Sequence, residues 1–263
     1  PQHQAAGTIQ LPGSKSLTNR VLLLAALGTG KIRVINALRS DDTRHMLTAL
    51  TSLGVSWTEE GTDLLVEGKG GPFDTNADLF LGNAGTAMRP LTAALTLGGG
   101  SYRLHGEPRM HERPLGDLVN ALRPLGATIR YEGDAGFPPV KIDAHGLKGG
   151  ATTISGSLSS QYLSAILMAA PLAEGDVHIT IEGDLVSKPY VSLTMGLMKQ
   201  FGIEMTKQDW SQIHIPAPQT LRNPTEILVE GDASSASYFL AAGALAGDVT
   251  VKGLTKDLSL IHI

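Results

Sequence analysis

The chain has 263 residues, of which 42% are hydrophobic and 17% are charged, and its formal net charge is -4. This composition is typical of one or two globular domains with sizeable cores, and the acidic balance argues against binding to nucleic acid or to an anionic membrane. The chain has no cysteine, no paired spacing of metal-ligating histidines, no apolar run near the ~20 residues of a membrane span and no targeting peptide at its start, so we expect a cytoplasmic protein with no metal site.

Four segments are rich in alanine and leucine and are apolar nearly all round, which is typical of buried helices. In chain order they cover residues 19–28, 88–98, 161–170 and 237–247. Each is followed by a stretch that favours a β-strand, at residues 32–36, 101–105, 177–181 and 249–252. The same helix and strand therefore recur along the chain, which indicates an internal repeat.

A second, amphipathic helix is expected after the first three of these strands, at residues 43–53, 114–125 and 189–201. Each of these helices ends at a glycine and leads into a pair of short strands, at residues 56–58 with 64–67, 128–131 with 140–143, and 204–206 with 212–215. The pattern predicts an α/β fold of three βαβαββ units around buried helices, with pseudo-threefold symmetry. A fourth unit is expected to begin near Ile227.

Polar and basic residues stand just before the buried helices. Lys15, Ser16 and Arg20 surround the first helix start, Asn83 and Gly85 the second, and Ser159, Ser160 and Gln161 the third. A helix N-terminus exposes unpaired N–H groups and a partial positive charge, so it attracts anions. If the three units pack symmetrically, these helix starts face one end of the fold and one phosphorylated ligand could touch all of them.

The alternative interpretation is that these polar residues are ordinary N-caps. We favour that interpretation for Thr18, Thr86 and Ser157. It suits Lys15, Arg20 and Gln161 less well. For the two basic residues the reason is that a cation at a helix start opposes the helix dipole unless an anion is present.

Two loops before the amphipathic helices carry further candidates. Residues 106–114 hold Arg109 and Arg113 between prolines, which could fix a guanidinium for phosphate recognition, although Arg113 is equally expected to pair with a neighbouring glutamate on the surface. Residues 183–190 hold Ser187 and Tyr190, whose hydroxyls could meet a ligand or cap the next helix. The corresponding loop of the first unit begins with Ser40, which is expected to be an N-cap followed by two acidic residues.

Six motifs together resemble the 5-enolpyruvylshikimate-3-phosphate synthase family: LPGSKSLTNR, LGNAGTAMRPL, GEPRMHERP, GSLSSQYL, GDLVSKPY and VEGDASSASYFLAA. They run in family order from Gly7 to about Asp257. The resemblance implies the inside-out barrel of the enolpyruvyl transferases, with two lobes of three βαβαββ units each. Residues 14–229 would then form one complete lobe, and residues 1–13 and 230–257 would be pieces of the second.

The resemblance implies transfer of the enolpyruvyl group of phosphoenolpyruvate to the 5-hydroxyl of shikimate 3-phosphate, with release of phosphate and without a metal or organic cofactor. Shikimate 3-phosphate would be bound by Lys15, Ser16, Arg20, Ser159, Ser160, Gln161, Ser187 and Tyr190. Phosphoenolpyruvate or the inhibitor glyphosate would be contacted by Lys15, Asn83, Gly85, Arg109 and Gln161. Lys15 would be catalytic, because its charge would offset the charge that develops on the leaving phosphate. The full-length family protein is expected to be a monomer.

The sequence departs from the family pattern at residues 258–263, which match the in-frame translation of a transposon end used as a sequencing adapter, so we expect a tail derived from such an adapter. The family chain continues further, and the missing lobe would supply the acidic residues that move protons. We therefore expect a truncated chain that binds substrate but is inactive alone. Two alternatives stay open: an enolpyruvyl transferase acting on UDP-N-acetylglucosamine, which usually uses a cysteine, and a non-catalytic shikimate-phosphate-binding module.

Overall fold

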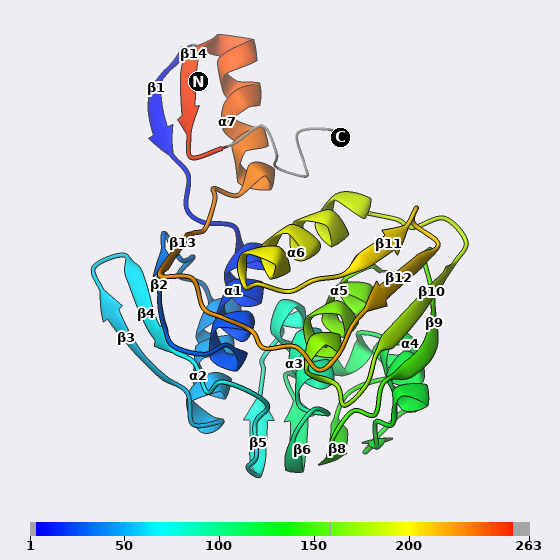
Figure 1. Ribbon diagram of the computed structural model, residues 1–263. Coiled ribbons are helices and arrows are strands. Elements are labelled where there is room, and N and C mark those ends of the chain that lie inside the picture. Colours follow the sequence, from blue (N-terminus) through cyan, green and yellow to red (C-terminus); the bar gives the residue numbers. More distant parts are fainter. Residues whose placement is uncertain (1–3, 158, 255–263) are drawn as a thin grey trace.

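The computed structural model describes residues 4–157 and 159–254, and it contains three four-stranded sheets that enclose a group of helices (Figure 1). The expected tail at residues 258–263 lies outside the described residues. The second unit shows the repeat most simply. Its strands are β5 (Ala77–Phe80), β6 (Gly99–His105), β7 (Ile129–Tyr131) and β8 (Val140–His145), in the spatial order β5-β6-β8-β7.

In the second unit, β5 and β6 run parallel and the other two pairs run antiparallel. Helix α3 (Gly85–Ala94) connects β5 to β6. A 3₁₀ turn, η1 (Pro108–Glu112), helix α4 (Gly116–Leu122) and a second 3₁₀ turn, η2 (Arg123–Leu125), connect β6 to β7. The predicted βαβαββ unit is therefore confirmed here.

The third unit repeats this arrangement with the order β11-β12-β10-β9. Its strands are β9 (Gly150–Ser155), β10 (Val177–Glu182), β11 (Thr206–Gln208) and β12 (Gln212–Ile215). Its helices are α5 (Ser160–Ala169), which ends in the 3₁₀ turn η3 (Ala170–Leu172), and α6 (Lys188–Gln200).

The first unit is completed by a strand from the far end of the chain. It contains α1 (Lys15–Leu27), β2 (Lys31–Ile35), α2 (Asp41–Ser52), β3 (Ser56–Glu60) and β4 (Asp63–Glu67). Its parallel edge strand is β13 (Glu226–Leu228), which pairs with β2. The expectation that a fourth unit begins near Ile227 is wrong: this segment lies in the first sheet, because β2 leaves an edge that the chain covers only after passing through the other two units.

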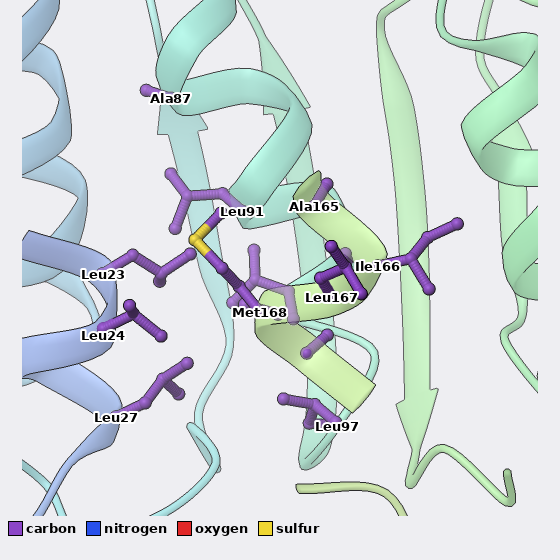
Figure 2. Packing of buried hydrophobic residues seen from close by; sticks show 14 of the residues in the cluster. Leu23, Leu24, Leu27, Ala87, Leu91, Leu97, Ala165, Ile166, Leu167 and Met168 are labelled. Carbon is purple, nitrogen blue, oxygen red and sulfur yellow. The ribbon is translucent and has the colours of Figure 1, made fainter. Parts of the chain in front are cut away.

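The core lies where the three predicted buried helices meet. Every residue of α1 from Leu17 to Leu27 is buried, and most of α3 and α5 is buried as well. Figure 2 shows Leu23, Leu24 and Leu27 of α1 pointing toward Leu91 of α3 and Met168 of α5. Each fully buried leucine contributes about 1.5–3 kcal/mol through removal of its surface from water. This central packing fixes the relative positions of the three helix starts.

The fourth predicted buried helix is exposed. Helix α7 (Ala233–Ala246) lies beside a two-stranded parallel sheet of β1 (Ala5–Gln10) and β14 (Gly247–Lys252), apart from the three large sheets (Figure 1). Only Ala236 of this helix is buried, and Leu245 is 87% exposed. The helix is apolar, as predicted. Among the described residues, however, it packs mainly against β14 and β1, so most of its surface stays exposed. No described helix combines the length and the apolar character needed to cross a membrane.

Candidate functional site

The starts of the buried helices are joined to one another by side-chain hydrogen bonds. Asn19 Nδ2 of α1 donates to Thr86 Oγ1 of α3 at 2.8 Å. A guanidinium nitrogen of Arg89 on α3 donates to Gln161 Oε1 of α5 at 3.0 Å. The predicted convergence of the three helix starts at one end of the fold is therefore what the structure shows.

Arg20 connects the first helix to the fifth and sixth. Its Nε donates to Thr194 Oγ1 of α6 at 2.8 Å, and one terminal nitrogen reaches Ser164 Oγ of α5 at 3.4 Å. The other terminal nitrogen donates to the carbonyl oxygen of Ser16 at 2.9 Å. Arg20 is only 6% exposed, and burial lowers its pKa to about 10. Within the described chain these partners are all neutral, so the guanidinium holds a buried positive charge with no carboxylate beside it.

Lys15 occupies the first position of α1 and is held by an acidic residue of the neighbouring helix. Its Nζ lies 3.5 Å from Asp42 Oδ2 of α2, and the same oxygen accepts a hydrogen bond from Thr86 Oγ1 at 3.1 Å. Asp42 therefore orients Lys15 toward the junction of α1 and α3. Ser40 forms the expected N-cap, in a capping box with Thr43. The contacts of Asp42 with Lys15 and Thr86 were not predicted from the sequence.

Lys15 and Ser16 line a pocket of about 160 Å³ between the starts of α1, α6 and α7. Tyr190 contributes from α6, and Asp232 and Ser234 contribute from the start of α7. The structure thus places three predicted shikimate-phosphate residues on one concavity. It adds the beginning of α7, a polar helix start of the same kind whose residues were not among the predicted ligand contacts.

The two arginines of the loop at residues 106–114 are placed differently. Arg109 pairs with Glu112, and its side chain is 75% exposed. Arg113 instead donates from one terminal nitrogen to the carbonyl oxygen of Asn83 at 2.7 Å. The expected pairing of Arg113 with a neighbouring glutamate is therefore wrong, and it is Arg109 that forms such a pair.

Gly85 brings the backbone of α3 against two guanidinium groups. A Cβ atom at this position would lie 2.4 Å from a terminal nitrogen of Arg113 and 2.5 Å from one of Arg89. Burial lowers the pKa of Arg89, with the nearby charge of Arg113 lowering it further. Two cations therefore flank one helix start, and the absence of a side chain at Gly85 leaves room beside them. The motif containing Arg89 was recognised in the sequence, but its role at the site was not.

The predicted N-cap roles of Thr18, Thr86 and Ser157 are wrong. Ser14 and Ala84 occupy the N-cap positions of α1 and α3. Thr18 instead lies inside α1, where its hydroxyl donates to the Ser14 carbonyl and accepts from the backbone N–H of Leu38. Thr86 lies inside α3 and bridges helices, because its hydroxyl accepts from Asn19 of α1 and donates to Asp42 of α2.

The remaining candidates lie at the starts of α5 and α6. Ser159 caps α5 by accepting from the backbone N–H of Gln161 at 3.2 Å, and Ser160 follows it as the first residue of the helix. Ser187 stands at the N-cap position of α6 in a left-handed conformation, with φ 55°, and its side chain does not cap the helix. Its hydroxyl thus does not serve the capping role that sequence analysis offered as an alternative.

The chemistry of this end of the fold is that of an anion site. Lys15, Arg20, Arg89 and Arg113 bring four cationic groups to helix starts whose unpaired N–H groups also favour negative charge. None of the groups of histidine and acidic residues that could share a metal ion lies here among the described residues. The arrangement can hold phosphate and carboxylate groups, and it can stabilise negative charge that develops during a reaction.

Comparison with known proteins identifies the family. The sequence model of EPSP synthase (3-phosphoshikimate 1-carboxyvinyltransferase) matches residues 1–259. A 3-phosphoshikimate 1-carboxyvinyltransferase from Marinomonas sp. (strain MWYL1) is 57% identical over 261 residues, which are 98% of this chain and 61% of the relative. One from Cupriavidus necator is 55% identical over 260 residues, covering 97% of this chain and 60% of the relative. The chain spans about three fifths of the length of these curated relatives.

Solved structures agree with this identification. EPSP synthase from Acinetobacter baumannii superimposes with a TM-score of 0.84 at 27% identity, over 97% of this chain and 57% of that chain. The enolpyruvyl transferase NikO from Streptomyces tendae superimposes with a TM-score of 0.75 over 99% of this chain and 60% of that one, and at 18% identity this likeness concerns the fold alone. The predicted fold class is thus confirmed, and the chain belongs to the EPSP synthase family.

Proposed function

We propose that this chain is the shikimate 3-phosphate-binding part of an enzyme that transfers the enolpyruvyl group of phosphoenolpyruvate to the 5-hydroxyl of shikimate 3-phosphate and releases phosphate. The observation that carries the proposal is Arg20, a buried guanidinium that joins α1, α5 and α6 through neutral partners. A buried charge is costly unless it is paired, so such a group is suited to an anionic ligand.

Shikimate 3-phosphate carries a phosphate and a carboxylate, and this end of the fold offers cationic and hydroxyl groups for both. The proposed contacts are those of the first, fifth and sixth helix starts: Lys15, Ser16, Arg20, Ser159, Ser160, Gln161, Ser187 and Tyr190. The hydrogen bonds of Arg20 to residues of α5 and α6 support this set, because they hold the three helix starts in a fixed relation.

Phosphoenolpyruvate is proposed to bind between the starts of α1 and α3, near Lys15, Asn83, Gly85 and Gln161. The geometry favours Arg113 over Arg109 for this role. Arg113 lies against Asn83 and Gly85, whereas Arg109 is engaged with Glu112 on the surface. An exposed pair of this kind is worth little energetically, so Arg109 adds little to a preformed phosphate site.

In the proposed reaction, the 5-hydroxyl oxygen bonds to C2 of phosphoenolpyruvate while C3 gains a proton and the hydroxyl loses one. The resulting tetrahedral intermediate then loses phosphate and the C3 proton, which restores the enol double bond. Lys15 is proposed to stabilise the negative charge that builds on the leaving phosphate. Both steps move protons, and proton transfer needs positioned acids and bases. The contacts proposed here are cationic, hydroxyl and amide groups, and none of them is assigned to proton transfer. We therefore propose that the chain binds substrate without turnover when it is alone.

Titration calorimetry with shikimate 3-phosphate tests this function. Lys15→Ala should weaken binding by at least about tenfold, since hydrogen bonds to charged groups contribute about 1.5–3 kcal/mol. Lys31→Ala is the matched control, because the exposed Lys31 of β2 pairs with Glu67 of β4 and the substitution should leave binding unchanged. A well-folded chain that does not bind shikimate 3-phosphate would contradict the proposal.

Two further measurements separate the alternatives. Phosphate release from shikimate 3-phosphate and phosphoenolpyruvate at enzyme-like rates would show that the chain is active alone. Saturable binding of UDP-N-acetylglucosamine in place of shikimate 3-phosphate would favour the other enolpyruvyl transferase.

We also propose that the full-length protein is a cytoplasmic monomer. Sedimentation experiments can check its oligomeric state, and cell fractionation can check its location.

A further inference from the structure

Three potential metal ligands meet on the outer face of the third sheet. Asp176, His178 and His214 each present a ligand atom, and these atoms all lie within 4.8 Å of one another. His178 on β10 and His214 on β12 are direct cross-strand partners in an antiparallel pair. Their neighbours Val177 and Ile179 are buried in the core, so the alternation of the strand turns His178 outward.

The three groups are held in place before any ion binds. The two imidazole rings are stacked with an interplanar angle of 12° and a centroid distance of 4.5 Å. Asp176 Oδ2 lies 3.0 Å from His214 Nε2, and its other oxygen accepts a hydrogen bond from the backbone N–H of Ala217 at 3.0 Å. Strand register therefore fixes the imidazoles, and the backbone fixes the carboxylate.

The donor set selects the kind of ion. Two imidazole nitrogens and one carboxylate oxygen suit Zn²⁺ and similar transition ions, whereas Mg²⁺ and Ca²⁺ prefer oxygen ligands throughout. The adjoining hollow of about 230 Å³ is lined by the two histidines together with uncharged side chains, among them Thr180, Thr206, Gln208 and Gln212. No lysine or arginine is among these described lining residues. The negative charge of the nearby Asp176 carboxylate therefore favours binding of a cation at this face.

We propose that Asp176, His178 and His214 form a binding site for one Zn²⁺ ion, with water completing the coordination. The ion would bridge β10 and β12 and stabilise the third sheet. The cluster lies at the beginning of β10, whereas the loop that leads to α6 follows the end of this six-residue strand. At about 3.3 Å per residue the two ends of the strand are about 16 Å apart, so the site is separate from the anion site and does not depend on the proposed function.

The second sheet supplies a natural comparison. There His105 Nε2 of β6 lies 2.7 Å from Asp78 Oδ1, so one imidazole and one carboxylate also meet. The register partner of His105 on β5 is Phe80, however, and Arg103 also reaches Asp78. With one imidazole and a competing cation, this pair should not hold Zn²⁺, and His105 is a matched control for His178 and His214.

Titration calorimetry of the untagged chain with Zn²⁺ tests the proposal. One ion should bind per chain. His178→Gln and His214→Gln should each weaken binding by more than about tenfold, since even partners outside the ligand shell contribute about 10–100-fold. His105→Gln should leave the affinity unchanged. Mg²⁺ at the same concentration should neither bind nor compete.

A second measurement keeps the result independent of heat signals. Co²⁺ in place of Zn²⁺ should give visible absorption bands that disappear in His178→Gln and persist in His105→Gln, and circular dichroism should show that each variant is folded. Zn²⁺ should raise the thermal midpoint of the wild type and not that of His178→Gln. Equal Zn²⁺ affinity of the wild type and the His178→Gln, His214→Gln double variant would overturn the proposal, as would loss of binding in His105→Gln.

Discussion

Arg20 shows how a single residue at this site is set by its surroundings. Burial without a carboxylate partner lowers its pKa to about 10, so the folded chain holds this proton less tightly than the unfolded chain does. The resulting cost to stability is fully present below about pH 10 and is relieved as the pH rises from there toward the ordinary, higher pKa of arginine. Near neutrality this cost does not vary with pH. An anion placed beside the guanidinium would recover part of it.

Thr194 is expected to be essential for keeping Arg20 in place. The residue is fully buried, and its hydroxyl accepts from Arg20 Nε at 2.8 Å. Thr194→Val leaves that donor without its partner, which should cost about 1–3 kcal/mol of unfolding free energy. Urea denaturation measures the loss, and calorimetry should show weaker binding of shikimate 3-phosphate by the folded variant.

Thr92→Val is the control for this prediction. Thr92 is equally buried, but its hydroxyl donates only to the carbonyl oxygen of Met88 in its own helix. Removing this hydroxyl therefore leaves no charged donor without a hydrogen-bond partner. A loss for Thr92→Val as large as that for Thr194→Val would show that the effect comes from replacing a buried threonine and not from Arg20.

Sequence reasoning identified the residues whose local position is unusual and missed those defined by distant contacts. Lys15 and Arg20 were found because a cation opposes the dipole at a helix start. Asp42 and Thr194 were not found, since each is an ordinary helix residue until another element packs against it. Arg20 and Thr194 are 174 positions apart, and no spacing rule connects them. Asp176 and the two histidines of the proposed zinc site were missed for the same reason.

At the scale of elements, the repeat was predictable because periodicity and end signals agree within each segment. The helices that are apolar all round did become the centre of the fold in three of four cases. The exception, α7, is as rich in apolar residues as α1, α3 and α5 but remains exposed. An apolar composition indicates that burial of a helix would be favourable. It does not indicate whether other elements of the chain pack around that helix.

Helix α6 offers a test of local helix energetics near the site. Gly196 lies inside this helix, is exposed, and would meet no atom within 4 Å if it carried a Cβ. Gly196→Ala should therefore raise the unfolding free energy by about 0.5–1 kcal/mol, because glycine loses more backbone entropy than alanine in a helix. Urea denaturation provides the measurement.

The paired variant Gly202→Ala should have the opposite effect. Gly202 follows the same helix with φ +80°, where a side chain costs about 1–2 kcal/mol. If both substitutions changed stability in the same direction, backbone conformation would not be the cause.

At the scale of the whole molecule, the exposed apolar surface of α7 should drive self-association. Tyr238, Leu240 and Leu245 are all exposed on this helix, and several large exposed apolar side chains on one element favour contact between molecules. Sedimentation velocity of the 263-residue chain should show association that increases with concentration. The double variant Leu240→Lys, Leu245→Lys should sediment as a monomer at the same concentrations.

Phe80→Lys is the control, because Phe80 is an exposed apolar side chain on β5 of the second sheet, away from α7. If Phe80→Lys abolished association as completely as the α7 variant, the association would not be specific to α7.

The edge strand β13 also determines when the first sheet can be completed during synthesis. Asn36 at the end of β2 donates its side-chain amide to the carbonyl oxygen of Val229, a residue 193 positions later. At about 5–20 residues per second, a ribosome needs roughly 10–40 seconds to make that interval. Throughout this time the nascent β2 has an open edge beside the helix that carries Lys15 and Arg20. The first residues of the proposed binding site to be synthesised are thus among the last to reach their final surroundings.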